Sequence, residues 1–316
     1  MQLIDAATTR RHLAFGPLID ALRAMFVAGC EVPARGVHRI DGAAGGGTLL
    51  VMPAWRAGAR LGLKTVTIFP ANGTRGLPGL HSTYLLFDAA TGVPLAQLDG
   101  NEITSRRTAA AAALAASYLA RRDAHRLLIL GTGRVAALLA DALRTVRPIA
   151  SVEVWNHRPA SAHALAAGLR AAGIEARATE DLAAAVARAD IVSCATLSSA
   201  ALVHGAWLRP GTHLDLVGAF KPDMRESDDA CVLRSSVFVD TRAGALKEGG
   251  DIVQPLRSGL LKESDIRAEL AELTGGLHRG RVSSDEITLF KSVGAALEDL
   301  AGAVLAYRQS EGGTTG

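Results

Sequence analysis

Apolar and polar positions follow a regular alternation through the second half of the chain. Between residues 124 and 250, short apolar runs alternate with segments whose apolar residues recur at helical spacing. Such an order predicts a parallel sheet covered by helices on both faces. The predicted strands are Arg126–Leu130, Val152–Trp155, Ile191–Ala195, His213–Val217 and Val237–Val239. The predicted helices are Val135–Val146, Ser161–Ala172 and Thr179–Ala187, where Thr179 ahead of Asp181 and Leu182 indicates a cap.

The region before residue 110 has a different pattern. After an amphipathic helix at Pro17–Ala28, the segments Thr48–Met52, Arg60–Phe69 and Thr83–Phe87 are β-rich and bounded by Gly and Pro. This pattern predicts a second domain, which by elimination holds the substrate. An alanine-rich helix, Thr108–Ala120, is expected to link the domains, and a last helix, Leu289–Tyr307, to return to the first. We therefore predict an α/β protein with a Rossmann-type doubly wound sheet at 117–289 and an α+β domain at 1–116 completed by 290–316.

A glycine-rich turn follows the first strand of the parallel sheet. Leu127–Leu130 runs directly into Gly131-Thr132-Gly133-Arg134-Val135-Ala136, and a helical pattern begins at once. In a G-x-G-x-x-A turn the first glycine allows the tight bend, the second lets backbone N–H groups approach phosphates, and the alanine permits close helix packing. The helix N-terminus adds positive partial charge. This segment predicts a dinucleotide pyrophosphate site.

The end of the second strand indicates which dinucleotide is bound. An NAD site places an acid there for the ribose 2′-hydroxyl, whereas this chain has Asn156, His157 and Arg158. An uncharged residue followed by arginine leaves room for a 2′-phosphate, which favours NADP(H). The alternative is that Glu153 contacts the ribose and Arg158 is a solvated loop residue. The turns after the next two strands, at 194–196 and 217–219, are expected to flank the cofactor.

Composition limits the classes of function. The chain has 316 residues, enough for two domains, and its net charge of +3 is spread rather than clustered, so we expect no nucleic-acid partner. Cys30, Cys194 and Cys231 lie far apart, which favours neither a disulfide framework nor a zinc site and fits a reducing cytoplasm. The longest apolar run, Ala109–Ala116, is short of a membrane span, and we identify no export signal.

Three cations of the first domain are candidates for binding an anion. Lys64 has the apolar neighbours Leu63 and Val66, and Arg107 begins a nearly all-alanine stretch; Arg35 is the third. A long cation in apolar company is costly without a partner, and arginine binds a carboxylate bidentately. Taken singly, each could equally be a solvated or snorkelling side chain, and spacing does not establish that they converge.

Several motifs resemble one known family over almost the whole chain. The matching stretches are Val51–Ala54, Gly62–Lys64, Leu77-Pro78, Leu98–Thr104 with Arg106–Ala110, Gly131–Gly133, Leu216–Ala219 and Asp285–Gly294. On these residues the chain resembles the ornithine cyclodeaminase and mu-crystallin family. The resemblance implies that Arg35, Lys64 and Arg107 bind a substrate carboxylate, that Thr83 and Thr108 lie on the cofactor side, and that the first domain forms a homodimer.

The chain departs from the cyclodeaminases at two positions. Phe220 stands where those enzymes carry an aspartate, and Leu50 where they carry a second carboxylate. Neither side chain can ionise or activate water. The stretch Gly218–Glu226 instead resembles mu-crystallin and the bacterial ketimine reductases, which implies NADPH-dependent reduction of Δ1-pyrroline-2-carboxylate and Δ1-piperideine-2-carboxylate to L-proline and L-pipecolate.

That interpretation assigns provisional roles to the remaining site residues. Met52, Leu50 and Phe220 would form an apolar wall for the substrate ring, and His81, Asp223 or solvent would supply a proton. The expected cofactor-binding residues are Thr83, Arg107, Thr108, Gly131, Thr132, Gly133, Arg134, Val135, Asn156, His157, Arg158, Cys194, Ala195, Thr196, Val217, Gly218, Ala219 and Val293. NADH is the weaker alternative cofactor, and no metal is expected.

Two other functions remain open from the sequence. The first is another enzyme of the same family, an ornithine cyclodeaminase or an NAD-dependent amino-acid dehydrogenase. The second is a non-catalytic protein of mu-crystallin type, in which NADP(H) stabilises a ligand-binding dimer. An assay for NADPH loss with a cyclic imine distinguishes these from a reductase.

Overall fold

The chain divides into two units in the computed structural model, which describes residues 1–42 and 46–312. The first unit comprises Met1–Arg107 and Ala295–Gly316, and the second comprises Thr108–Gly294. The boundaries therefore lie at 107/108 and 294/295, where the sequence suggested 116/117 and 289/290. Residues 313–316 of the expected first domain lie outside the described residues.

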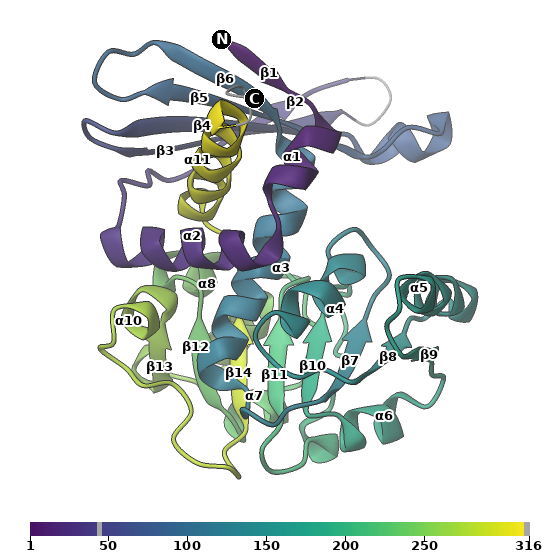
Figure 1. The fold of residues 1–316 in the computed structure, drawn as a ribbon. Helices are drawn as coiled ribbons and strands as arrows, with labels where there is room; N and C mark the ends of the chain where they lie inside the picture. Colours follow the sequence, from purple (N-terminus) through teal and green to yellow (C-terminus); the bar gives the residue numbers. More distant parts are fainter. Residues whose placement is uncertain (43–45, 313–316) are drawn as a thin grey trace. The chain divides into compact units, whose positions relative to one another are not determined.

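A six-stranded sheet forms the first unit, in the order β1-β6-β5-β4-β3-β2. Its strands are β1 (Gln2–Ile4), β2 (Gly36–Ile40), β3 (Gly47–Arg56), β4 (Arg60–Ile68), β5 (Leu80–Asp88) and β6 (Pro94–Asp99). Burial alternates along β3, β4 and β5, so that one face of the sheet is buried. Helices α1 (Ala6–His12) and α11 (Ala296–Gly312) lie on that face, and α2 (Phe15–Ala28) packs on α11 (Figure 1).

Eight parallel strands form the sheet of the second unit, in the order β13-β12-β14-β11-β10-β7-β8-β9. The strands are β7 (Arg126–Leu130), β8 (Ser151–Trp155), β9 (Ala176–Ala178), β10 (Ile191–Cys194), β11 (His213–Leu216), β12 (Ser236–Val239), β13 (Ile266–Glu269) and β14 (Thr288–Lys291). The strand order reverses between β7 and β10, which is the topological switch point of a Rossmann-type sheet. The predicted fold class is confirmed.

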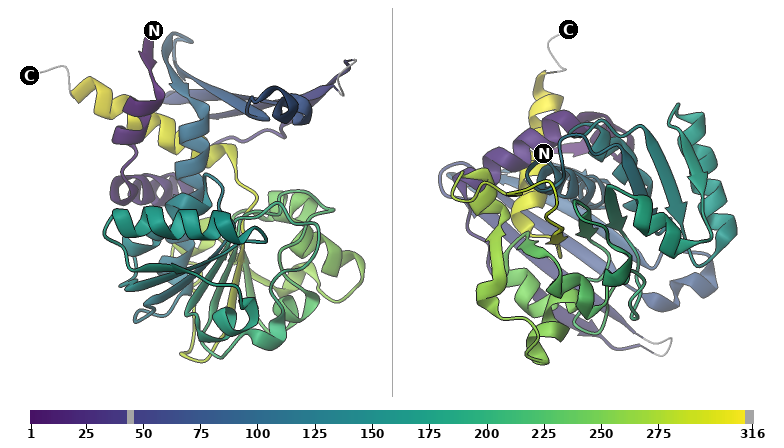
Figure 2. Two further views of the ribbon diagram at one scale, coloured as in Figure 1. Left: turned by 90° about the vertical axis from the view of Figure 1, so that its right-hand side faces the viewer. Right: turned by 90° about the horizontal axis from the view of Figure 1, so that it is seen from below.

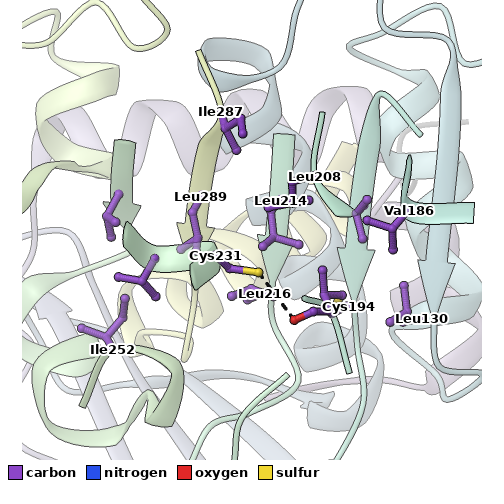
Figure 3. Packing of buried hydrophobic residues seen from close by; sticks show 14 of the residues in the cluster. Leu130, Val186, Cys194, Leu208, Leu214, Leu216, Cys231, Ile252, Ile287 and Leu289 are labelled. Carbon is purple, nitrogen blue, oxygen red and sulfur yellow. Dashed lines mark hydrogen bonds between the residues drawn. The ribbon is translucent and has the colours of Figure 1, made fainter. Parts of the chain in front are cut away.

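Helices cover both faces of this parallel sheet (Figure 2). They are α4 (Ala136–Arg144), α5 (Pro159–Ala171), α6 (Leu182–Arg188), α7 (Asp229–Leu233), α8 (Arg242–Glu248), α9 (Gly250–Arg257) and α10 (Leu270–Thr274). A core of fully buried residues from the central strands, including Leu130, Leu214, Leu216 and Leu289, packs against them (Figure 3). Cys231 belongs to this core, and its Sγ donates a hydrogen bond to the Val203 carbonyl at 3.5 Å.

The helix expected at Leu289–Tyr307 is wrong at its beginning. Residues Thr288–Lys291 form β14, which pairs with β11 on one side and β12 on the other. All four residues are buried, because a central strand of a parallel sheet is covered on both faces. Gly294 then adopts a left-handed φ of 80°, and the helix begins at Ala296.

Two other helix starts also differ from expectation. The cap of α6 is Asp181 rather than Thr179: Asp181 Oδ1 accepts a hydrogen bond from the Ala184 N–H at 3.0 Å. Thr179 lies two residues before the cap, and its N–H donates to the Val154 carbonyl, which continues the pairing of the strands. The linking helix α3 (Gly100–Leu119) begins eight residues before Thr108, with Asp99 Oδ1 accepting from the Glu102 N–H at 2.8 Å. Among the described residues, no helix combines the length and apolar character needed to cross a bilayer.

Candidate active site and cofactor-binding turns

Two of the three nominated cations meet a pair of buried carboxylates in the first unit. Lys64 Nζ lies 2.5 Å from Asp299 Oδ2. Arg107 Nε lies 2.9 Å from Asp299 Oδ1, and Arg107 Nη1 lies 2.6 Å from Glu298 Oε2. Both carboxylate side chains are completely buried. We call Lys64, Arg107, Glu298 and Asp299, together with the half-buried Arg35, the buried ionic cluster.

The strand register explains why a lysine points into this interior. Lys64 lies opposite Met52 on β3 and Tyr84 on β5, so all three side chains share the buried face. Gly62 leaves room for the Tyr84 side chain on this face, since a Cβ at position 62 would lie 1.8 Å from the Tyr84 hydroxyl. Helix α11 packs on β3 and β4 and carries Glu298 in its first turn, where the helix dipole also favours acids.

Charges within the cluster act on one another strongly. Burial lowers the pKa of Lys64 to about 8, with Arg107 and Arg35 adding to the effect and Asp299 opposing it. Arg35 acts electrostatically on Lys64, which places its charge in the neighbourhood of that lysine. Burial disfavours the charge of Arg107, yet Asp299 and Glu298 hold its pKa above the ordinary value. The pKa of Asp299 is lowered, because Arg107 and Lys64 outweigh its burial.

Glu298 and Asp299 are the site residues that sequence reasoning missed. Lys64 and Arg107 were expected to need an anionic ligand as partner, whereas both contact carboxylates of the protein itself. A signal was present, since two adjacent acids interrupt the apolar run of the last helix. An acid pair at such a position is rarely buried unless it is paired.

The structure does not bring His81 or Thr83 to the ionic cluster. His81 pairs with Thr67 and Thr83 with Thr65, so both side chains lie on the sheet face opposite that of Lys64. His81 is also exposed. Leu50 shares the Lys64 face, because it lies opposite Val66, and it is half-buried. Thr108 follows Arg107 on α3.

The glycine turn of the second unit has the geometry that a dinucleotide requires. Gly131 has a φ of 105°, and a Cβ there would lie 2.5 Å from the Ala195 carbonyl oxygen. A Cβ on Gly133 would meet no atom within 4 Å, so the space beside its backbone is open. Arg134 is exposed, and Val135 is the cap residue of α4 but provides no side-chain hydrogen bond to the first turn. The Ala137 and Leu138 N–H groups donate to the Gly133 and Val135 carbonyls, at 3.0 and 2.9 Å, so the first turn of the helix is already closed. The positive end of the helix dipole still favours a phosphate at this turn.

The end of β8 contacts this turn directly. Asn156 Nδ2 donates to Thr132 Oγ1 at 2.6 Å, and the next residues, His157 and Arg158, are exposed. The alternative role for Glu153 finds no support, because both its oxygens bind Arg188, at 2.6 and 2.5 Å. An acid held in this way is poorly placed to accept from a ribose hydroxyl.

The turns after β10, β11 and β14 hold the other expected cofactor residues. The Val217 N–H donates to the Cys194 carbonyl at 2.9 Å, and the Cys194 side chain is buried in the core. Thr196, Gly218 and Ala219 share one acceptor, Glu226. The Val293 N–H donates to Asp240 Oδ2 at 2.8 Å. In the turn after Ala219, Phe220 is 36% exposed and Asp223 is exposed.

Comparison with known proteins agrees with these features. The chain is 40% identical over 300 residues to a Δ1-pyrroline-2-carboxylate reductase of Paracoccus denitrificans, covering 95% of this chain and 94% of the relative. The structure of the Thermococcus litoralis Δ1-pyrroline-2-carboxylate reductase with NADH and L-proline matches with a TM-score of 0.92 and 35% identity, over 99% of this chain and 98% of that one. An archaeal alanine dehydrogenase dimer with bound NAD matches with a TM-score of 0.91 and 29% identity, over 100% and 98%.

The family model agrees with both kinds of comparison. It spans residues 8–314, which is nearly the whole chain and includes both the ionic cluster and the glycine turn. Both named reductases are more than a third identical to this chain and align with it over almost its whole length. The similarity is therefore not confined to the dinucleotide-binding unit. The chain belongs to the ornithine cyclodeaminase/mu-crystallin family.

Proposed function

We propose that this protein is an NADPH-dependent reductase of cyclic ketimine carboxylates, converting Δ1-pyrroline-2-carboxylate and Δ1-piperideine-2-carboxylate to L-proline and L-pipecolate. It is an oxidoreductase that acts on a C=N bond. Relatives named as Δ1-pyrroline-2-carboxylate reductases support the reaction class. The complex of one such relative with L-proline supports a small imino or amino acid as ligand.

The charge of the buried ionic cluster carries this proposal. Lys64 and Arg107 balance the two buried carboxylates, and the half-buried Arg35, which acts electrostatically on Lys64, adds a positive charge. One carboxylate on a small substrate neutralises that charge, whereas a dianion would leave a buried excess. Arg107 Nη2 takes part in neither of the contacts to Glu298 and Asp299, so it can donate to a substrate oxygen.

Imine reduction makes modest demands on the protein. When bound, the nicotinamide supplies a hydride to the C=N carbon. Lys64, Arg107 and Arg35 hold the substrate carboxylate, which fixes the orientation of the ring. Met52, Leu50 and Phe220 offer apolar contacts to ring methylenes. The imine nitrogen is itself basic, so solvent supplies its proton, and the exposed Asp223 remains a candidate donor.

A cyclodeaminase reaction is disfavoured by two side chains. Removing ammonia from a diamino acid requires a group that accepts a proton from the ammonium and then positions water. Phe220 and Leu50 cannot ionise and stand where the cyclodeaminases carry carboxylates. The reduction of a preformed imine does not need that group.

The preference for NADPH rests on the loop after β8. Arg158 is exposed and follows Asn156, whose side chain bonds Thr132 of the glycine turn. A 2′-phosphate at this position receives a charge-assisted contact from Arg158. Glu153, which would repel the phosphate, is neutralised by Arg188 and Arg177.

The second face of the six-stranded sheet supports a homodimer. Two neighbouring sets of paired residues lie on that face, and all of them are half-buried: Pro53, Leu63 and Leu85 in one set, and Leu61 and Phe87 in the next. An apolar sheet face of this kind marks an association surface. The helices of the unit lie on the other face (Figure 1). Light scattering on the purified protein tests the dimer.

A steady-state screen of both cyclic imines with NADPH and NADH tests the reaction. We expect oxidation of NADPH with either imine, formation of the matching L-amino acid, and a higher kcat/KM with NADPH than with NADH. Cofactor binding without turnover of either imine would support the non-catalytic alternative. Turnover of alanine or ornithine in place of imines would assign the chain to another activity of its family.

A further inference from the structure

Glu226 joins two of the turns that follow strands of the parallel sheet. Its Oε1 accepts from the Thr196 N–H at 2.7 Å and from Thr196 Oγ1 at 2.8 Å. Its Oε2 accepts from the N–H groups of Gly218 at 2.8 Å and Ala219 at 3.2 Å. Four donors from the ends of β10 and β11 therefore converge on one completely buried carboxyl group.

The surroundings of Glu226 are built to a close fit. A Cβ on Gly218 would lie 2.0 Å from the Thr196 carbonyl oxygen and 2.4 Å from Glu226 Oε1, so only glycine lets the carboxyl group approach. The backbone at 226 is also held, because the Glu226 N–H donates to Asp251 Oδ1 at 2.8 Å. Asp251 in turn binds Lys291 Nζ through Oδ2, at 3.0 Å.

The electrostatic environment leaves the Glu226 carboxyl group close to titration at neutral pH. Burial raises the pKa of Glu226 to about 7, with Lys291 and the bonds from Thr196 opposing the shift and Asp251 adding to it. The titratable groups nearby come from five elements. Asp251 on α9 and Lys291 on β14 act on Glu226 directly, and Glu226 acts on Cys194 on β10. Asp215 on β11 and Cys231 on α7 in turn act on Cys194.

Protonation changes what this carboxyl group can hold. The ionised form has only acceptors and satisfies all four donors at once. In the neutral form a proton on Oε2 faces the N–H groups of Gly218 and Ala219, whereas a proton on Oε1 can be donated to the Thr196 hydroxyl. In either case the donors lose a charged acceptor, and hydrogen bonds to a neutral carboxyl group are weaker than those to a carboxylate.

We propose that Glu226 is a positioning residue for the nicotinamide cofactor: its ionised carboxylate holds the turns at 194–196 and 217–219 in the arrangement that binds the dinucleotide, so that cofactor binding expels a proton from Glu226. This inference rests on the proposed function for the cofactor itself and for the two turns. It assigns a role in binding to a residue that contacts neither the reacting atoms nor, by its side chain, solvent.

Calorimetry in buffers of different ionisation enthalpy measures the expelled proton. The ligand is NADH, because it lacks the 2′-phosphate of NADPH, which itself titrates near pH 6. With half-ionisation near pH 7, binding at about pH 6 should release about 0.9 proton per site, and binding at about pH 8.5 almost none. Affinity should be about thirtyfold lower at about pH 5.5 than at about pH 8.

Two variants separate this role from a purely structural one. Glu226→Gln should weaken NADH binding at about pH 8 at least tenfold, on the scale of lost hydrogen bonds to a charged group, and should abolish the proton release. Asp215→Asn is the matched control. Burial also raises the pKa of Asp215 to about 7, but Asp215 accepts from Ser193 and from neither turn, so proton release should persist.

The outcomes are distinguishable. Proton release that persists in Glu226→Gln, or that disappears only in Asp215→Asn, overturns the inference, as does a wild-type affinity that is equal at both pH values. If Glu226→Gln does not fold, as judged by circular dichroism, the wild type and Asp215→Asn decide the question. Failure of the wild type to bind either NADH or NADPH at about pH 8 refutes the proposed function instead.

Discussion

Replacing Asp299 by asparagine tests the buried ionic cluster most directly. The substitution keeps the shape of the side chain but removes the negative charge that lies 2.5 Å from Lys64 Nζ and 2.9 Å from Arg107 Nε. Lys64 then loses the one nearby group that favours its charged form most strongly, while burial and the two arginines still oppose that form. The pKa of Lys64 must therefore fall below its wild-type value of about 8.

The expected shift is large enough to measure. An opposite charge within about 4–6 Å changes a pKa by roughly 1–3 units, so the pKa of Lys64 in the variant should fall by that amount. Only the protonated lysine holds the substrate carboxylate. In the wild type kcat/KM should decrease as the pH rises through about 8, and in Asp299→Asn this decrease should begin roughly 1–3 pH units lower. Removing one partner of a buried pair should also destabilise the fold by about 3–5 kcal/mol.

The assay is a pH profile of kcat/KM for Δ1-pyrroline-2-carboxylate with saturating NADPH. Titration of the substrate affects every protein equally, so the comparison between variants isolates the cluster. Glu102→Gln is the matched control, because it removes a carboxylate from α3 whose partner, Arg10, is largely exposed; such a pair contributes about 0–1 kcal/mol. An alkaline limb that stays in place in Asp299→Asn, or moves to higher pH, would refute the reasoning.

Three further predictions concern the cofactor site and the reaction. Gly131→Ala should lose both stability and cofactor binding, because the φ of Gly131 is 105° and a Cβ would lie 2.5 Å from a carbonyl oxygen. Gly133→Ala should keep its melting temperature and lose only cofactor affinity, because a Cβ there meets no atom within 4 Å. Equal melting temperatures for the two variants would contradict this. Arg158→Ala should raise the KM for NADPH roughly tenfold or more, since a charge-assisted contact contributes about 1.5–3 kcal/mol. The KM for NADH should stay nearly unchanged. An equal loss with both cofactors would exclude a phosphate contact. With NAD and L-ornithine the wild type should release no detectable ammonia. Phe220→Asp should impair imine reduction by adding an unpaired carboxylate near an anionic substrate. Ammonia release by the wild type at a rate comparable with its imine reduction would show that another residue replaces the missing acid.

Elements whose signal is local could be predicted from the sequence. The β7 strand, the turn at Gly131 and helix α4 lie where the pattern places them, because apolar periodicity and glycine conformation are properties of a few neighbouring residues. Strand β14 was predicted as helix, since its identity depends on pairing with β11 and β12, which are distant in the chain. Strands β9 and β13 were not predicted, because their sequences, Ala-Arg-Ala and Ile-Arg-Ala-Glu, contain charged residues and lack the apolar run of the central strands.

The site divides in the same way. The sequence by itself indicated the family, the glycine turn and three candidate cations, because motifs and residue types can be recognised along the chain. Only the tertiary structure decided what surrounds those cations. Arg107 and Asp299 are 192 residues apart, and they meet because α11 packs on the face of the sheet to which the β4 alternation directs Lys64. Long-range packing of this kind determines the charge of the site and the pKa values of its groups. A local sequence pattern contains no information about that packing.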